Sequence, residues 1–456
     1  MWISKQLIFM VLTLLFGSVG SFVLTPVCGL AVYYMYSTVR PQFLWDWALP
    51  PDPGWSFIVA VSTLAATAVW RLGIFAPLKV AAPPWYGEPP YTRSHYLFLA
   101  FTAWICLTYP TAVNMDRAYE FFLEYVKIFV MFIAATLILR TVRDLWLVYM
   151  VVLLCAIYVG YEINFLYVAH QYLILQSRGF CGLDNNGAAL ILAMAIPMAF
   201  FAWEAVRHKV RWLFLLAIPM LIHGVLLSYS RGAMVSLCAV APLILVRTRH
   251  KLMLGAVYAG LAAAMPFMAG KEIQERFFSI SKADADDSAN SRWTTWKIAV
   301  KMANERPLFG YGIRNSNLFT YAYGADIPGR SIHSQYLQTA ADSGWVALGL
   351  YLALLGSVFL GMRDVRRYLR PFTDPESLRV KSLASGLETS LLLFCVGAVF
   401  LSLEHFEMPY IVMLLAMQLH AITRAVAAKL ATRPPAAGYP YPGPAGPYPA
   451  PTLPPA

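Results

Sequence analysis

Hydrophobic stretches of about 20 residues follow one another along almost the whole chain, and this pattern constrains the fold more than any other feature. Of the 456 residues, 59% are hydrophobic and 13% are charged, whereas soluble domains carry about 25% charged residues. A helix of about 20 apolar residues crosses a bilayer core that is roughly 30 Å thick. We therefore expect an all-α polytopic membrane protein.

The apolar runs predict about twelve transmembrane helices. The first run, 7–36, is too long for one straight helix, and Gly17, Gly20 and Pro26 are expected to break it. It forms either one broken span or a re-entrant pair. The other predicted spans are 55–70, 95–112, 121–139, 145–168, 187–202, 212–227, 232–246, 252–269, 345–362, 387–403 and 409–425.

The loops between the spans predict the orientation of the chain. Loops 207–211, 247–251 and 363–381 are rich in lysine and arginine, and they alternate with loops poor in positive charge. Positively charged loops stay in the cytoplasm, so we expect both termini to be cytoplasmic. The remaining loops, including the polar segment 270–344, then face the periplasm of a bacterial inner membrane.

The same pattern divides the chain into four parts. Residues 1–269 are expected to form transmembrane helices one to nine or ten, and 270–344 a partly helical periplasmic loop domain. Residues 345–427 hold the C-terminal transmembrane helices. The tail, 428–456, is rich in Pro, Gly and Tyr and is expected to be a disordered cytoplasmic extension, because such a composition cannot bury a core.

The net charge of +11 lies mostly in short loops between spans, which the positive-inside bias explains without nucleic-acid binding. The six cysteines form no Cys-x-x-Cys pair, so neither a zinc site nor a disulfide framework is supported. The short acidic run 284–287 is more often a solvated loop than a metal site. No Walker loop or dinucleotide fingerprint is present. We expect no metal and no cofactor.

His333 is the first candidate catalytic residue. It precedes a predicted helix for which Ser331 is the expected N-cap and Gly344 the expected break before the next span. A histidine in the first turn of a helix is disfavoured as imidazolium by the helix dipole, so a neutral His333 can accept a proton. The alternative is a loop histidine that only hydrogen-bonds the backbone.

Two arginines at the outer ends of spans are candidate anion-binding residues. Arg231 follows Ser228-Tyr-Ser and precedes Gly232, and its planar fork of donors fits a phosphate bidentately. Arg178 lies in a glycine-rich loop that Asp184 or Asn185 caps before the next span. The alternatives are a snorkelling interfacial arginine for Arg231 and plain turn chemistry for the loop around Arg178.

Two further arginines lie inside the 270–344 segment. Arg292 begins an amphipathic helix in which Trp293, Trp296 and Val300 recur at helical spacing. Such a helix lies along a membrane surface with its tryptophans down, and Arg292 contacts either a phosphate or lipid headgroups. Arg314 follows the Gly-Tyr-Gly turn and is a weaker candidate. Glu162 and Lys127 lie inside spans, where they need polar partners.

The order of these motifs resembles the bacterial O-antigen ligase/polymerase superfamily. Ser-Arg-Gly at 230–232, Arg-x-x-x-Trp at 292–296, Pro-Leu-x-Gly-x-Gly at 307–312 and His-Ser-x-Tyr-Leu at 333–337 precede Gly-Trp and a span. The N-terminal part, with Arg-Pro-Gln-Phe-Leu-Trp-Asp-Trp at 40–47, resembles the O-glycosylation ligases associated with exosortase systems. Ser334 stands where that superfamily usually has asparagine.

The resemblance implies a metal-independent glycosyltransferase of the GT-C type. Its donor is a glycan on undecaprenyl diphosphate, and its acceptor, for an O-antigen ligase, is lipid A–core oligosaccharide at the periplasmic face. His333 orients or deprotonates the acceptor, and the positively charged residues stabilise the departing diphosphate. These are Arg178, Arg231, Arg292 and Arg314.

Other activities remain open from the sequence. A protein O-oligosaccharyltransferase and an O-antigen polymerase use the same donor, so the arginines and His333 do not separate them from a ligase. A transporter of lipid-linked sugars predicts substrate residues near the middle of the membrane and inverted repeats. The candidate residues instead gather at one face, which favours an enzyme that works among membrane lipids.

Overall fold

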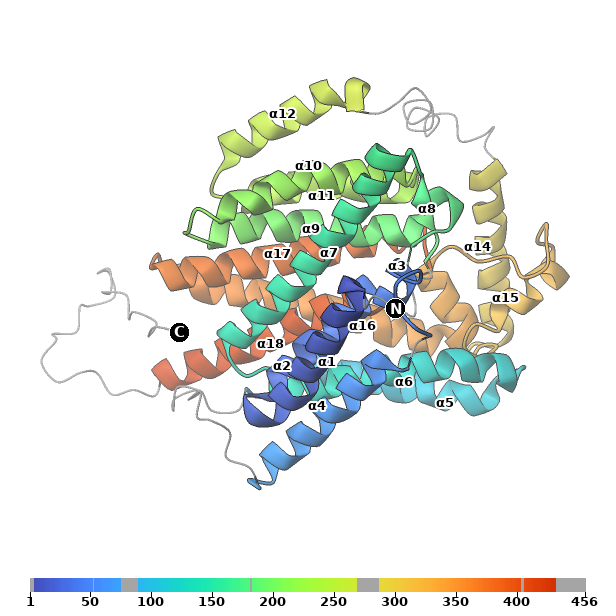
Figure 1. Cartoon of the computed structure of the whole chain (residues 1–456). Helices are drawn as coiled ribbons and strands as arrows, with labels where there is room; N and C mark the ends of the chain where they lie inside the picture. The colour runs from blue at the N-terminus through green and yellow to red at the C-terminus, as the bar shows by residue number, and fades with distance from the viewer. Residues whose placement is uncertain are drawn as a thin grey trace, which may run out of the picture.

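The computed structural model describes residues 4–51, 53–74, 89–180, 183–268, 287–402 and 406–431. Within these ranges the chain forms helices joined by loops, with one short bridge between Phe180 and Leu183. Most of the helices lie side by side in one bundle, and a smaller group lies across one end of it (Figure 1). The predicted acidic run lies outside the described residues except for Asp287.

The first apolar run is a helical hairpin. Helix α1 (Lys5–Val23) turns at Leu24 and Thr25 into α2 (Pro26–Val39). A Cβ atom placed on Gly17 would lie 3.0 Å from Val32, and one placed on Gly20 would lie 3.4 Å from Cys28. The two helices are therefore antiparallel and in close contact, so the pair is the alternative that forms, and the chain turns next to Pro26 rather than at Gly17 or Gly20, which lie inside α1.

The hairpin places the start of α1 at one end of the bundle. The Oγ atom of Ser4 donates to the carbonyl of Ala48 at 2.9 Å, and Asp46 in the same loop pairs with Arg178. The start of α1 therefore lies at the end of the bundle that carries the 171–186 loop, beside α3 (Pro41–Leu44), whereas α18 ends at the opposite end (Figure 1). The first and last described helices, α1 and α18, therefore begin and end at opposite ends of the bundle, and the expected orientation of the termini stays a prediction.

Seven helices in the described residues are long and apolar enough to cross a membrane. Every predicted span overlaps a helix, so an all-α polytopic membrane protein is confirmed, while the count of twelve crossings stays a prediction. The seven are α1, α6 (Met115–Ile138), α7 (Val142–His170), α9 (Asn185–Ala205), α16 (Gln335–Leu369), α17 (Pro375–Gly397) and α18 (Glu407–Ala431). The other apolar helices of the bundle are α2, α4 (Trp55–Arg71), α5 (Arg93–Thr108), α10 (Arg211–Leu227), α11 (Arg231–Arg247) and α12 (Lys251–Met268).

Helix α9 forms the centre of the bundle. Every residue from Gly187 to Ala205 is buried, as expected for a helix that is apolar on all sides. It packs against α10 on one side and α17 on the other. Its N-terminus points toward the end of the bundle that carries the polar loops.

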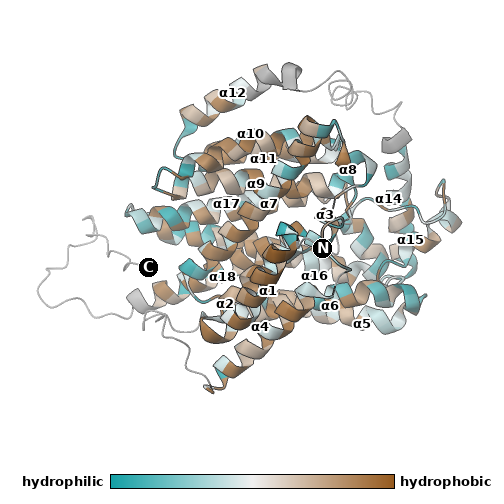
Figure 2. Cartoon of the chain, in the orientation of Figure 1, coloured by the Kyte–Doolittle hydropathy of each residue, from teal (hydrophilic) through white to brown (hydrophobic). Residues whose placement is uncertain are grey.

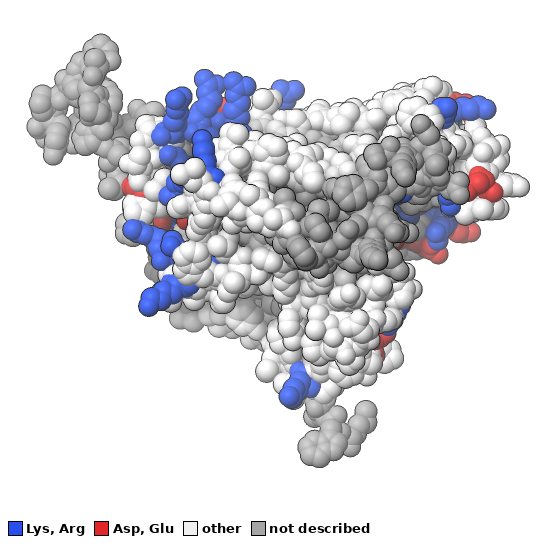
Figure 3. Space-filling model, turned by 90° about the horizontal axis from the view of Figure 1, so that it is seen from above, with Lys and Arg blue, Asp and Glu red and all other residues white. Residues whose placement is uncertain are grey.

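Hydropathy and charge separate the two ends of the bundle from its middle. Apolar residues dominate the long helices, and hydrophilic residues gather toward the ends (Figure 2). Lysine and arginine gather at the end opposite α14 (Figure 3). At that end Arg247 and Arg366 both pair with the buried Glu388, and Arg249 lies 4.0 Å from Glu204.

The other end carries short helices and the described part of the polar segment. Helix α14 (Asp287–Glu305) runs across the bundle rather than along it, with α15 (Ser316–Phe319) beside it (Figure 1). A 3-10 turn, η3 (Thr320–Tyr323), follows α15, and α8 (Ile174–Ser177) lies near the start of α9. Most of the predicted site residues lie in or beside these elements.

Candidate functional site

His333 lies just before a helix rather than in its first turn. Helix α16 begins at Gln335 with Ser334 as the N-cap, so the predicted cap at Ser331 is wrong. The reason is the backbone of His333, whose φ of 52° is left-handed and cannot continue a helix. The next segment is fixed to α17, because the amide of Gln335 donates to the carbonyl of Ala398 at 2.8 Å.

The predicted break at Gly344 is confirmed. Gly344 has φ 83° and ψ 169° and separates the segment 335–343 from the longer part of α16. A Cβ atom there would lie 2.0 Å from the carbonyl oxygen of Leu308. The amide of Trp345 donates to the carbonyl of Pro307 at 2.8 Å, so the break holds the 307–312 loop against the helix that follows His333.

The Pro-Leu-Phe-Gly-Tyr-Gly loop is bound to the same segment along its length. The amide of Tyr311 donates to Ala341 at 3.0 Å, and the amide of Gly312 donates to Asp342 at 2.8 Å. Gly310 has φ 64°, and a Cβ atom there would lie 2.4 Å from the backbone of Asp342. Gly310 is therefore required by close backbone contact with the histidine-bearing segment, whereas a Cβ atom on Gly312 would lie 2.3 Å from Ala112.

Arg314 follows this loop in a left-handed conformation, with φ 56°. Its amide donates to a carboxylate oxygen of the buried Asp342 at 3.0 Å. Its guanidinium lies over the ring of Phe121 on α6, at 5.4 Å from the ring centre. Contacts with Asp342 and Phe121 therefore hold both the backbone and the side chain of Arg314.

Arg292 lies near the start of α14, as predicted, but the helix buries a different face. Trp293 is 59% exposed, whereas Trp296 packs inward and its ring lies 6.2 Å from Phe400. The buried face holds Thr295, Ile298, Ala299, Met302 and Ala303. The two tryptophans are neighbours on the helix surface, with ring centroids 6.1 Å apart, and Trp296 is the inner and Trp293 the exposed member of this pair.

Arg231 is the first residue of α11 and is half-buried. The turn before it is fixed to α9, because Asn185 donates its side-chain amide to the carbonyl of Ser228 at 2.9 Å. A Cβ atom on Gly232 would lie 3.3 Å from Phe400, the residue beside Trp296. Arg231 therefore belongs to the corner where α9, α11, α14 and α17 meet.

Arg178 makes a different contact from the other arginines. Its guanidinium donates to Asp46 at 2.9 Å, and both side chains are more than 45% exposed. Hydrogen bonding to Arg178 lowers the pKa of Asp46. An exposed pair of this kind adds little to stability, and it fastens the 171–186 loop to the loop after α3.

Two charged residues near His333 are not among the predicted site residues. Asp184, predicted only as a cap, is the N-cap of α9 and accepts from the amide of Gly187 at 2.8 Å. Arg330 donates through Nε to the hydroxyl of Ser291 at 2.9 Å and lies 3.2 Å from Asp326. Gly-Arg-Ser, shortly before His333, is the signal in the sequence that points to Arg330.

These charges act on His333. Burial lowers the pKa of the imidazole below its ordinary value of 6.5, and Arg292, Arg330 and Arg314 lower it further, while Asp184 opposes them. The predicted neutral histidine is therefore supported by burial and nearby arginines rather than by a helix dipole. Three arginines and one carboxylate act on this imidazole, and this arrangement suits an anionic ligand.

The lowered pKa leads to a prediction on pH. If neutral His333 accepts a proton during the reaction, the rate stays constant above its pKa and falls about tenfold per pH unit below it. Because the pKa lies below 6.5, we expect a flat profile from about pH 8 to about pH 6.5 and a decline only at lower pH. The measurement is the rate at saturating substrate, with circular dichroism confirming the fold at each pH. A decline that begins above pH 7 would contradict it.

Left-handed residues other than glycine gather at this end of the molecule. Tyr229 precedes Arg231 by two residues and has φ 56°, and Arg314 and His333 have φ 56° and 52°. Such conformations cost of order 1–3 kcal/mol each and concentrate at functional sites, where the surrounding structure holds them. This supports assigning function to Arg314 and His333 together.

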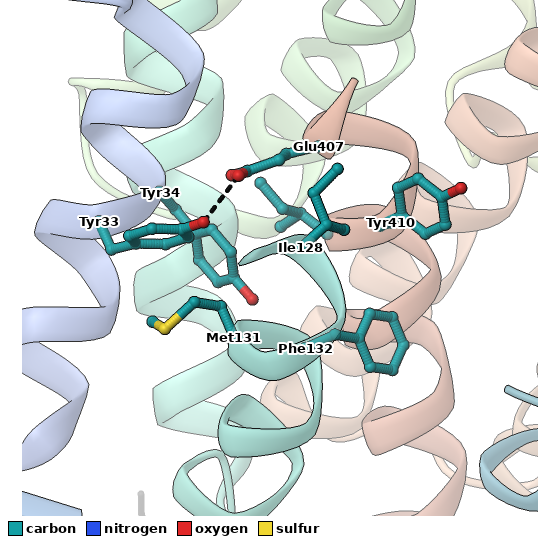
Figure 4. A pocket seen from close by; sticks show the side chains of 8 residues that line it. Tyr33, Tyr34, Ile128, Met131, Phe132, Glu407 and Tyr410 are labelled. Carbon is teal, nitrogen blue, oxygen red and sulfur yellow. Dashed lines mark hydrogen bonds between the residues drawn. The ribbon is translucent and has the colours of Figure 1, made fainter. Parts of the chain in front are cut away.

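Other polar groups in the bundle have local partners. Tyr33 donates to Glu407 at 2.7 Å in a small cavity between α2, α6 and α18 (Figure 4). Lys127 pairs with Glu124 at 2.7 Å, and Glu162 accepts from Tyr158. Lys127 and Glu162, whose roles the sequence left open, therefore each have a polar partner. Among the described residues no group of three His, Cys, Asp or Glu side chains is placed to hold a metal ion.

Residues 218–352 match the model of a protein family described as O-Antigen ligase. This stretch runs from α10 into α16 and contains Arg231, Arg292, Arg314 and His333, whereas Arg178 lies outside it. No curated protein matches the chain. The match of residues 218–352 therefore supports the resemblance of this chain to the O-antigen ligase superfamily.

Proposed function

We propose that this protein is an O-antigen ligase. It transfers a glycan from undecaprenyl diphosphate to lipid A–core oligosaccharide, as a metal-independent glycosyltransferase of the GT-C type. The observation that carries the proposal is the group of arginines around His333, inside the stretch that matches the ligase family. A neutral base beside fixed positive charges is what a transfer from a diphosphate carrier requires.

In the proposed reaction an acceptor hydroxyl attacks the anomeric carbon of the donor glycan. The new glycosidic bond forms as the bond to the diphosphate oxygen breaks, and undecaprenyl diphosphate leaves. His333 orients the hydroxyl and takes its proton. Negative charge grows on the departing diphosphate, and fixed positive groups stabilise it more in the transition state than in the ground state.

We propose that Arg292, Arg314 and Arg231 bind this diphosphate. The first two act on the His333 imidazole, and Arg231 begins the helix beside them. In this proposal the arginines supply the positive charge that a divalent ion supplies in other diphosphate chemistry. Arg178 would bind donor only by exchanging its present partner, Asp46.

The proposed location is a bacterial inner membrane with the site facing the periplasm. The lysines and arginines at the opposite end of the bundle support this (Figure 3), because positively charged loops stay in the cytoplasm. In this orientation the start of α1 is also periplasmic. Residues 270–344 then form the periplasmic loop domain, flanked by transmembrane helices within 1–269 and 345–427.

The test is transfer by the purified full-length protein. Undecaprenyl-diphosphate-linked glycan is supplied with lipid A–core, with protein acceptors bearing Ser and Thr, or alone, and products are separated by mass. Transfer to lipid A–core supports the ligase. Transfer only to protein would instead assign a protein O-oligosaccharyltransferase, and elongation without acceptor an O-antigen polymerase. Donor binding without product under all three conditions would favour a transporter.

The Arg231→Lys variant tests whether Arg231 binds the diphosphate through two hydrogen bonds or only through its positive charge. Arg231→Lys keeps the positive charge but loses the planar fork that matches a phosphate. We expect the rate of transfer to fall by about tenfold to a hundredfold, with acceptor KM unchanged. Arg211→Lys, at the start of α10 on the opposite end of the bundle, is the matched control. Full activity of Arg231→Lys would show that only the positive charge at position 231 is needed, and would contradict bidentate binding.

A further inference from the structure

Asp342 is fully enclosed by the elements of the candidate site. It lies on the last turn before the break at Gly344, and it is 2% exposed. One carboxylate oxygen accepts from the amide of Arg314 at 3.0 Å and from the side-chain amide of Gln338 at 2.8 Å. The other accepts from the amide of Ser316 at 3.0 Å. A buried carboxylate is stable only with such donors.

Two of these donors are backbone amides of one short loop. Amides of residues 314 and 316 point at one anion, as in the backbone concavities that bind anions elsewhere. The amide of Ser316 is also the first of α15, and Gln338 donates to the hydroxyl of Ser316 at 2.8 Å. The carboxylate therefore fixes both the loop and the start of the short helix.

The conformation that the carboxylate fixes is a costly one. Arg314 has φ 56°, a region that residues with a Cβ atom rarely adopt. Strain of this kind persists only where surrounding contacts determine it. On the far side of the loop, Asn315 accepts from the amide of Asn114 at 2.8 Å and fastens the loop to the start of α6.

We propose that Asp342 is a positioning residue for Arg314. Its carboxylate holds the loop in the left-handed conformation that presents the Arg314 guanidinium, over Phe121, to the diphosphate bound beside His333. This rests on the proposed function, and it assigns the fixed orientation of one donor-binding arginine to a carboxylate that touches no substrate. Charges oriented before the reaction stabilise a transition state without reorganising during it.

The test is a double-mutant cycle on donor turnover. Asp342→Asn keeps the shape of the side chain. However, both carboxylate oxygens accept hydrogen bonds, so the NH2 group that replaces one of them faces an N–H donor and that hydrogen bond is lost. We expect kcat to fall about tenfold, with acceptor KM unchanged. In the Arg314→Ala background Asp342→Asn should lower kcat almost no further, because the guanidinium that Asp342 positions is already absent. Asp364→Asn, at the far end of the same helix, is the control.

The outcomes separate the two proposals. If Asp342→Asn lowers kcat by the same factor in the wild-type and Arg314→Ala backgrounds, Asp342 does not act through Arg314. That result would overturn the positioning role and leave a purely structural one. Full activity of Arg314→Ala would instead remove Arg314 from the proposed function. If Asp342→Asn does not fold, Gln338→Leu removes one donor to the same carboxylate and should show the same coupling at smaller size.

A measurement without substrate tests the geometry alone. Amide hydrogen exchange of the 312–316 peptide should become at least tenfold faster in Asp342→Asn and remain unchanged in Asp364→Asn. Unchanged exchange at residues 312–316 would contradict the positioning role even if the wild-type protein transferred no glycan.

Discussion

Replacing His333 by asparagine is expected to lower the rate of glycan transfer severely while leaving the protein folded. Asparagine tolerates the left-handed conformation that His333 adopts, with φ 52°, so the backbone around it is kept and only the imidazole is lost. General bases contribute about a hundredfold to ten-thousandfold to rates, and a loss of that size is expected here. Transfer is measured with purified protein at saturating donor and acceptor.

Two controls accompany this experiment. His170→Asn changes a histidine that ends α7 at the same end of the bundle, and it should retain full activity. His333→Ala removes the imidazole but strains the backbone, so a drop in thermal stability in this variant and not in His333→Asn would confirm the conformational requirement. Activity within about threefold of wild type in His333→Asn would exclude proton transfer by this residue.

Replacing Gly344 by alanine is expected to destabilise the site end of the molecule. The new Cβ atom would lie 2.0 Å from the carbonyl oxygen of Leu308 and 2.6 Å from that of Pro307, at a φ of 83°. The loop 307–312 must then leave α16, and Arg314 leaves with it. Strained backbone and steric overlap together cost at least about 3 kcal/mol, and transfer should be lost as well.

Helix α16 provides the matched control for this prediction. A Cβ atom on Gly349 meets nothing within 4 Å, and alanine in place of glycine within a helix stabilises by roughly 0.5–1 kcal/mol. Gly349→Ala should therefore melt at the same or a higher temperature than wild type, measured by thermal denaturation in detergent. A similar melting temperature for Gly344→Ala and Gly349→Ala would contradict the close contact seen at Gly344.

Most of the secondary structure is predictable from the sequence, because the helices of a membrane protein are encoded in local hydropathy. Apolar runs set where the helices form, and turn-forming residues set where they end. The break at Gly344 is predictable for this reason, as is the helix that begins near Arg292. The motifs of 230–232, 292–296, 307–312 and 333–337 likewise indicate the superfamily from residue type and spacing alone.

The neighbours of His333 are only partly predictable. Arg292 and Arg314 are expected from the sequence and do act on its pKa, whereas Arg330 and Asp184 are not expected in that role, and Arg178 pairs with Asp46 instead. These neighbours come from α9, α14 and the loops before α15 and α16, which are distant in sequence. Residue type and spacing do not state which of several arginines in separate loops lies nearest to one imidazole.

The sequence by itself determined the class of the protein, because burying apolar runs in a bilayer requires only local hydropathy. It also determined the residues from which a site could be built. Only the tertiary structure decided that the first run is a hairpin, since Gly17 and Gly20 allow close contact between two helices. It alone placed Asp342 under Arg314 and turned His333 out of the helix, because those features depend on packing between segments that are far apart in the chain.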